Sequence, residues 1–230
     1  MLAIAIRLFT LRPSMRSTLF AFLVLCTCRL IAGDAVSLFD GQSLAGWTGP
    51  DGAAAGPGWV IDAGTLHLNG EKGGNLLSEK EYTNFDLEWE WKVEEGGNNG
   101  IKYWVTKVGG KEWLGIEYQM IDDAKHPDGM KGGSHTTASI YDIKEPAANK
   151  PLNPPGQWNV SRVVVQDGKI QHWLNGQMVC EADTTTDEWK AMIAASKFKS
   201  KEGFAPGKGR IMLTDHHDKV WFRSIKIKEK

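Results

Sequence analysis

The chain has few cysteines and no hydrophobic run long enough to cross a membrane. Of 230 residues only three are cysteine, Cys26, Cys28 and Cys180. The first two lie in an N-terminal stretch with the features of an export signal, and its removal would leave Cys180 alone. An intrachain disulfide is then excluded, so stability has to come from the core. The longest apolar run, within residues 17–28, falls short of the ~20 residues that a membrane-spanning helix needs, and no membrane span is expected.

That N-terminal stretch predicts export. Arginines at positions 7, 12 and 16 precede an apolar segment over residues 19–25, and small residues end the stretch at 31–33. This order is typical of a signal peptide. We therefore predict a signal peptide over 1–33, a single domain over 34–230, and a periplasmic or extracellular location. A retained anchor helix and a lipid anchor on Cys26 or Cys28 are the alternatives.

Several classes of function lack support. Lys and Arg number 27 against 28 Asp and Glu, and the arginines of the predicted signal would be lost, so no nucleic-acid partner is expected. There is no G-x-S-x-G motif for a serine nucleophile. There is also no E-x-D-x-E strand of the kind that glucanases use to place two carboxylates beside a glycosidic bond.

Alternating apolar and polar residues predict an all-β protein. Residues 84–93 are the clearest case, because Phe85, Leu87, Trp89, Trp91 and Val93 would face one side and polar residues the other. Two-residue turn signals, Asp-Gly and Asn-Gly, separate later segments. The pattern favours a two-sheet antiparallel sandwich of the jelly-roll kind, with further strands expected at 101–105, 114–121, 158–166, 169–174, 177–181, 211–214 and 220–227.

One short helix and one long loop interrupt this pattern. Thr185-x-x-Glu188 resembles a capping box, and Trp189, Met192 and Ile193 follow it with helical spacing. Residues 122–155 are rich in glycine and proline. A loop of that length in a compact domain is more often functional than not.

The strand at 114–121 and the loop after it offer the first candidate site residues. Glu117 and Gln119 share the face opposite the apolar residues, which is either a functional face or only the solvated side. The loop then brings Asp122, Asp123 and Asp128 close to His126. A divalent metal is possible there, although the spacing lacks the regularity of a calcium loop.

A second candidate cluster lies between the last two predicted strands. Asp215 and His216 occupy this connection, where histidine is suited to proton transfer near neutral pH. Arg223 follows on the last strand and is a candidate for holding an oxyanion. His172 alternates with apolar residues and is interpreted as a packed structural histidine.

An ordered set of short motifs resembles the bacterial 3-keto-disaccharide hydrolase domain family. The match runs from about residue 36 to 228, and each motif is weak alone. The motifs include SLFDGQSLAGW from Ser37, GGNLLSEKEY from Gly73, GIEYQMIDD from Gly115, HPD from His126, SIYD from Ser139, PGQWN from Pro155, WLNG from Trp173, SKF from Ser196, the Asp215-His216 pair and FRSI from Phe222.

This resemblance implies a concanavalin A-like lectin/glucanase fold and an enzyme that cleaves glycosides oxidised at C3. A C3 ketone acidifies the C2 proton, so a base can form an enolate that expels the C1 oxygen, and water can then add. Glu117 and His216 are the expected base and acid in either order. Arg223 or Lys197 would stabilise the enolate unless a metal does so, and the residues expected to bind the sugar are Glu88, Gln119, Asp122, Tyr141, Lys197 and Asp215.

Three positions depart from the family pattern: Thr214, His217 and Ser224 stand where members usually carry Gln, Gly and Asn. Three other functions remain open. A non-catalytic carbohydrate-binding module on the same fold would use Glu117 and His216 only to bind hydroxyls. A glucanase-type hydrolase and an adhesion domain with a calcium site are the other two. No oligomeric state is indicated.

Overall fold

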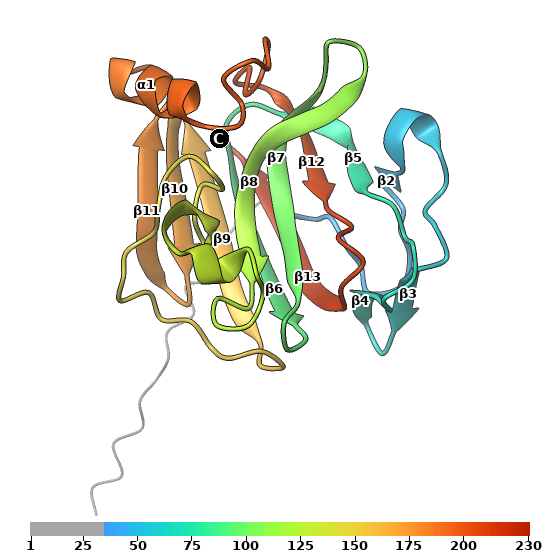
Figure 1. The fold of residues 1–230 in the computed structure, drawn as a ribbon. Coiled ribbons are helices and arrows are strands. Elements are labelled where there is room, and N and C mark those ends of the chain that lie inside the picture. Colours follow the sequence, from blue (N-terminus) through green and yellow to red (C-terminus); the bar gives the residue numbers. More distant parts are fainter. Residues whose placement is uncertain (1–34) are drawn as a thin grey trace, which may run out of the picture.

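The chain forms two antiparallel β-sheets packed face to face, as the sequence predicts (Figure 1). The computed structural model describes residues 35–230, so the predicted signal peptide and lipid-anchor cysteines lie outside the described residues. The larger sheet has the order β11-β10-β9-β6-β13-β4-β3, with β1 paired to β13, and the smaller has the order β2-β5-β12-β7-β8. The strands are β1 Val36–Ser37, β2 Trp47–Thr48, β3 Trp59–Asp62, β4 Thr65–Leu68, β5 Leu76–Tyr82, β6 Phe85–Val93, β7 Asn98–Val108, β8 Glu112–Ile121, β9 Asn159–Gln166, β10 Lys169–Leu174, β11 Gln177–Asp183, β12 Gly209–Leu213 and β13 Val220–Glu229.

Alternation along the strands builds the core between the sheets. Phe85, Leu87, Trp89 and Trp91 of β6 are at most 1% exposed, and they pack against the inner residues of β8. The Trp89 ring meets the ring of Tyr118 edge to face, with centroids 4.9 Å apart. Each strand therefore keeps its remaining side chains for the outer face of its own sheet.

The hairpin turns follow from their residues. Asp167-Gly168 and Asn175-Gly176 all have positive φ, as a two-residue turn of type I′ requires, and they join β9 to β10 and β10 to β11. His217 and Ser224 also have positive φ, of 68° and 53°. Glycine and asparagine tolerate this conformation better than histidine and serine do.

Among the described residues there is one α-helix, α1, which spans Asp187–Ala195 and begins one residue away from the predicted cap. The side chain of Thr186, not Thr185, accepts the hydrogen bond from the backbone N–H of Trp189. Because Trp189 occupies the third helical position, Glu188 cannot complete a capping box. Short 3₁₀ turns lie at Pro50–Gly52, Gly129–Lys131 and Gly133–His135. Within residues 35–230, no helix is long and apolar enough to cross a membrane.

Candidate active site

The outer face of β8 carries the buried carboxylate of Glu117. Ile116, Tyr118 and Met120 point into the core, so Glu117 and Gln119 point away from it, as the alternation predicts. Yet Glu117 is only 4% exposed. Its neighbour across the strand pair is Lys102 of β7, and the Lys102 Nζ lies 3.4 Å from the Glu117 Oε2. A polar residue hidden on an outer face needs charged or hydrogen-bonding partners.

Those partners keep Glu117 ionised. Burial by itself would raise the pKa of Glu117, but Lys102, His216 and Lys197 together lower that pKa to about 2. The Nε2 of His216 lies 3.7 Å from the Glu117 Oε1, and the side chain of His216 is 38% exposed. A fixed anionic group thus stands beside a solvent-accessible imidazole, an arrangement that suits proton transfer.

Gly100 makes room for this carboxylate. It lies on β7 opposite Gln119, and an ideal Cβ built on it would be 2.3 Å from the Glu117 Oε1. No side chain fits at this position without displacing Glu117. Thr214 fastens the same strand, because its backbone N–H donates to the carbonyl of Gly100 and its hydroxyl accepts from the backbone N–H of Gly100.

Residues 137–141 run along the free edge of β8 and carry Tyr141 to the site. The backbone N–H of Ala138 donates to the backbone carbonyl of Gln119, and the N–H of Tyr141 donates to the backbone carbonyl of Glu117. The Tyr141 hydroxyl donates to Asp128 at 2.7 Å, and the Nζ of Lys197 lies 4.0 Å from the centroid of the Tyr141 ring. Burial lowers the pKa of Lys197, and the nearby charge of Glu117 partly offsets this. Tyr141 and Lys197 therefore belong to the surroundings of Glu117.

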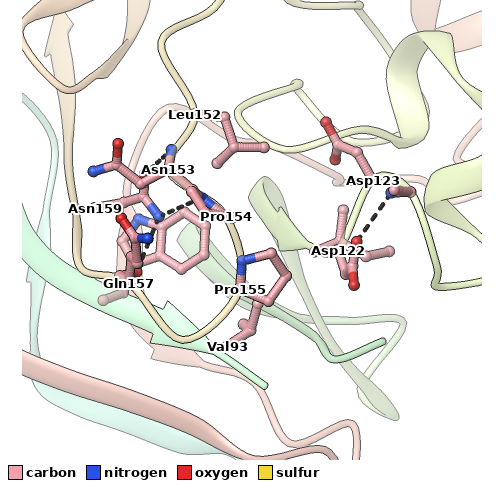
Figure 2. A pocket seen from close by; sticks show the side chains of 12 residues that line it. Val93, Asp122, Asp123, Leu152, Asn153, Pro154, Pro155, Gln157 and Asn159 are labelled. Carbon is pink, nitrogen blue, oxygen red and sulfur yellow. Dashed lines mark hydrogen bonds between the residues drawn. The ribbon is translucent and has the colours of Figure 1, made fainter. Parts of the chain in front are cut away.

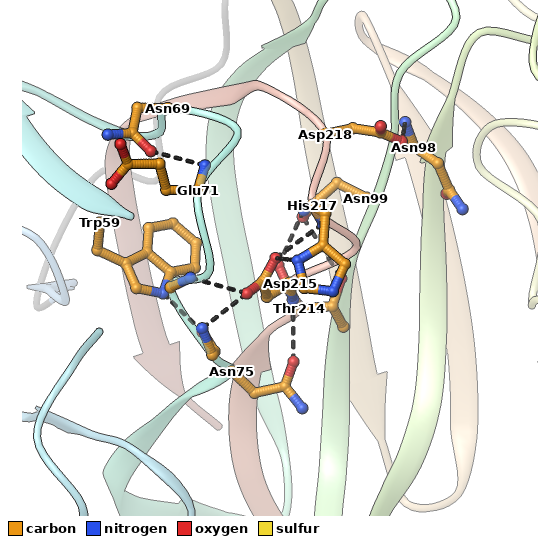
Figure 3. Close-up of polar contacts among 12 residues, drawn as sticks. Trp59, Asn69, Glu71, Asn75, Asn98, Asn99, Thr214, Asp215, His217 and Asp218 are labelled. Atoms are coloured by element: carbon orange, nitrogen blue, oxygen red, sulfur yellow. Dashed lines mark hydrogen bonds and ion pairs between the residues drawn. The ribbon is translucent and has the colours of Figure 1, made fainter. Parts of the chain in front are cut away.

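Asp215 holds the loop that carries His216, as Figure 3 shows. Its Oδ2 accepts hydrogen bonds from the backbone N–H groups of Gly73 and Gly74, at 2.9 and 2.7 Å. Its Oδ1 accepts from the N–H of His217 at 2.8 Å. With both oxygens engaged, Asp215 positions the loop rather than facing a ligand, which differs from the predicted role in sugar binding.

The carboxylate of Asp122 likewise accepts hydrogen bonds from the backbone. Its oxygens accept from the N–H groups of Gly96, Ala124 and Lys125. It borders a hollow of about 230 Å³ near the ends of β6 and β8, lined chiefly by apolar residues such as Val93, Leu152 and Pro155 (Figure 2). Asp122 comes directly after Ile121, the last residue of β8. Ile121 lies on the face of Glu117, and adjacent residues of a strand alternate between faces, so Asp122 does not share that face. The predicted sugar contact of Asp122 is therefore not supported.

The acidic loop that suggested a metal is engaged by protein donors. Asp123 pairs with Lys150 and accepts from Thr137, and Asp128 accepts from Tyr141, Lys131 and His135. Within residues 35–230, no group of three or more His, Cys, Asp and Glu side chains is arranged to hold a metal ion.

Arg223 and Glu88 lie on the opposite side of the sandwich. Both belong to the larger sheet, on strands β13 and β6, and their neighbours along the strands fill the core. Arg223 donates to Glu90 from Nε and Nη2, at 2.8 and 2.6 Å, and its guanidinium lies 4.1 Å from the centroid of the Trp158 ring. The prediction that Arg223 and Glu88 share a site with Glu117 is wrong, because β13 and β6 belong to the larger sheet whereas Glu117 lies on β8 of the smaller one.

His172 is a structural histidine, as predicted. It is fully buried, its Nδ1 is 3.1 Å from the carbonyl of Ala138, and its Nε2 is 2.9 Å from the hydroxyl of Tyr103. Because a carbonyl only accepts, Nδ1 carries the proton and the tyrosine donates to Nε2. Burial lowers the pKa of His172 to about 4, so this histidine stays neutral and anchors the segment that leads to Tyr141.

Comparison with known proteins settles the family. A model of the 3-keto-alpha-glucoside-1,2-lyase-like domain family matches residues 34–228. The chain belongs to this family. It is 32% identical to a 3-keto-disaccharide hydrolase of Bacteroides thetaiotaomicron, over 84% of this chain and 77% of that protein. A crystal structure from Parabacteroides distasonis, described as a candidate glycosyl hydrolase, superposes with a TM-score of 0.77 at 29% identity, covering 85% of this chain and 94% of that one. A second such structure from that organism gives 0.67 at 25% identity, covering 86% and 100%.

Sequence reasoning missed Lys102 and Gly100. Both would have followed from pairing residues 98–103 with 116–121 around the Gly109-Gly110 turn, since this register sets Lys102 opposite Glu117. It also missed Asp128 and His135 as the residues that hold Tyr141 in place.

Proposed function

We propose that this protein cleaves the glycosidic bond of 3-keto-glycosides on the outer face of the five-stranded sheet. The observation that carries the proposal is Glu117, a buried and ionised carboxylate beside the exposed imidazole of His216, with Lys102 and Lys197 close by. The family membership and the relative that acts as a 3-keto-disaccharide hydrolase support the substrate class.

The proposed reaction begins at the carbon next to the ketone. The neutral imidazole of His216 removes the C2 proton, and the electron pair of that C–H bond moves to form the C2–C3 double bond of an enolate. Glu117 is ionised throughout and stabilises the imidazolium that results. A lysine ammonium, from Lys197 or Lys102, stabilises the negative oxygen at C3.

The enolate then re-forms the ketone as a C1–C2 double bond forms and the C1–O bond breaks. The departing oxygen takes a proton from the imidazolium or a lysine. Addition of water across C1–C2 would give the free 3-keto sugar. A conventional glycosidase mechanism fits less well, since it needs two carboxylates about 5 Å apart for retention, whereas the charged partners of Glu117 are cations.

The test is incubation of the purified protein with a disaccharide and with its 3-keto form, in D₂O, with and without EDTA, followed by mass spectrometry. We expect cleavage of the keto form alone, with one deuterium at C2 of the hydrated product. A product lighter by one water would identify elimination as the endpoint, and loss of activity with EDTA would reveal a metal.

Two variants assign the roles. His216→Ala and Glu117→Gln should each lower kcat by at least about 100-fold, the range ascribed to general acid–base groups. If both variants keep full activity on the keto substrate, the assignment is wrong. If the wild-type protein binds the disaccharides but cleaves neither, the chain is a carbohydrate-binding module.

A further inference from the structure

A second hollow lies on the same sheet face as Glu117. It has a volume of about 320 Å³ and is lined by Thr48, Leu77, Glu79, Trp113 and Arg210, together with the 49–52 turn. Strand pairing connects it to the acid, because Leu77 pairs with Met212, Met212 with Lys102, and Lys102 with Glu117. At about 4.8 Å per strand, three steps place Leu77 roughly 14 Å from Glu117.

The hollow and Glu117 are also related along β8, through Trp113. It precedes Glu117 by four residues on β8, so both side chains point to the outer face, and at about 3.3 Å per residue they are roughly 13 Å apart. Between them stands Gly115, and the side chain of Val105 fills the space in front of it, with the Val105 Cγ2 2.6 Å from the position of a Cβ on Gly115. Two linked sugar rings would span this distance, whereas one ring would not.

The hollow has the composition of a sugar-binding site. Leu77, Val105 and Met212 form a small buried apolar patch separate from the main core, and Trp113 packs against it while remaining partly exposed, so Trp113 is the member of this group that a ligand can reach. Around this patch stand the charged groups of Asp51, Glu79 and Arg210. Apolar surface with an aromatic ring suits the C–H face of a pyranose, and the polar rim suits its hydroxyls.

Trp113 also differs from the tryptophans of the core. The indole N–H groups of Trp47, Trp59, Trp91 and Trp104 each donate a hydrogen bond inside the protein. The indole N–H of Trp113 has no hydrogen-bond partner within residues 35–230, although it lies close enough to Asp51 to help Lys107 lower the pKa of that carboxyl. An internal hydrogen bond therefore does not account for the placement of this ring.

We infer that this hollow binds the leaving sugar of the substrate, so that the chain prefers 3-keto-glycosides whose leaving group is itself a sugar over those with a small alcohol. This inference rests on the proposed function for the placement of the reacting ring at Glu117. Lys102, which lies between the two places, is then within reach of the linking oxygen.

The experiment compares two substrates, a 3-keto-disaccharide and methyl 3-keto-glucoside. Trp113→Ala should raise KM for the disaccharide about tenfold, which corresponds to about 1.4 kcal/mol, and change KM for the methyl glycoside less than about twofold. Trp113→Phe should restore most of the affinity, because it keeps a flat ring. Glu79→Ala removes an exposed rim group without touching the core, and should raise KM for the disaccharide about threefold. Equal effects on both substrates, or none on either, overturn the inference.

The matched control is Trp158→Ala, another partly exposed tryptophan, which lies on the outer face of the larger sheet beside Arg223. It should leave both KM values unchanged; a rise confined to the disaccharide would contradict the assignment of the hollow. If the wild-type protein cleaves neither substrate, the proposed function fails, but the hollow can still be tested by calorimetry with unoxidised disaccharide. Binding by wild type that Trp113→Ala abolishes supports the hollow, and an absence of binding by wild type overturns it.

Discussion

Replacing Gly100 with alanine should disable the site without unfolding the protein. The φ of Gly100 is not positive, so alanine introduces no backbone strain. Its Cβ would lie 2.3 Å from the Oε1 and 2.9 Å from the Cγ of Glu117. Because ordinary contact begins at 3.4 Å, the carboxylate has to move by about 1 Å, and a misplacement of that size lowers turnover by about 100-fold.

Steady-state cleavage of a 3-keto-disaccharide measures this loss, and circular dichroism checks that the fold persists. Displacing Glu117 also strains its ion pair with Lys102, so Gly100→Ala should lower Tm. A double-mutant cycle isolates the cause: in a Glu117→Ala background the carboxylate is gone, and alanine at position 100 should no longer lower Tm. The reasoning is refuted if Gly100→Ala keeps full turnover, or if it lowers Tm equally in both backgrounds.

Three further outcomes follow from the geometry. Arg223→Ala should leave kcat and KM unchanged, since Arg223 lies on the other sheet; a 100-fold loss would return it to the site. Asp215→Ala removes three hydrogen bonds to backbone N–H groups, so it should destabilise the chain by about 3 kcal/mol in urea unfolding. It should also lower kcat, because the loop that carries His216 is then held less firmly. An unchanged kcat would argue against this positioning role. Folding lowers the pKa of His172 from 6.5 to about 4, so between these two pH values the unfolded chain binds more protons than the folded one. The free energy of unfolding should therefore fall by roughly 3 kcal/mol as the pH is lowered from 7 to 4. His172→Gln should abolish this part of the pH dependence.

Local patterns in the sequence predicted much of the fold, because alternation and turn chemistry act over a few residues. The strand at 84–93 and the Asp167-Gly168 and Asn175-Gly176 hairpins are found where they were expected. The early strands β2 to β5 were not predicted. They are short or, like β5, carry the charged run Glu79-Lys80-Glu81 on an otherwise apolar strand.

The candidate site was harder to predict, since it depends on which sheet each strand joins. Periodicity says that Arg223 points away from the core, but two outer faces satisfy that condition, and only the sheet order separates Arg223 from Glu117. The carboxylates of Asp122 and Asp215 raised a different difficulty. A loop aspartate that holds backbone N–H groups has the same sequence appearance as one that binds a ligand.

The segment at 137–141 also closes the border of the smaller sheet. β8 is its last strand, and an uncovered last strand presents N–H and C=O groups that recruit strands from other chains. Backbone hydrogen bonds from Ala138 and Tyr141 occupy that border. Shortening this loop would therefore expose the edge of β8 and lower solubility, in addition to displacing Tyr141. The length of the loop thus protects the chain from self-association as well as positioning a residue of the site.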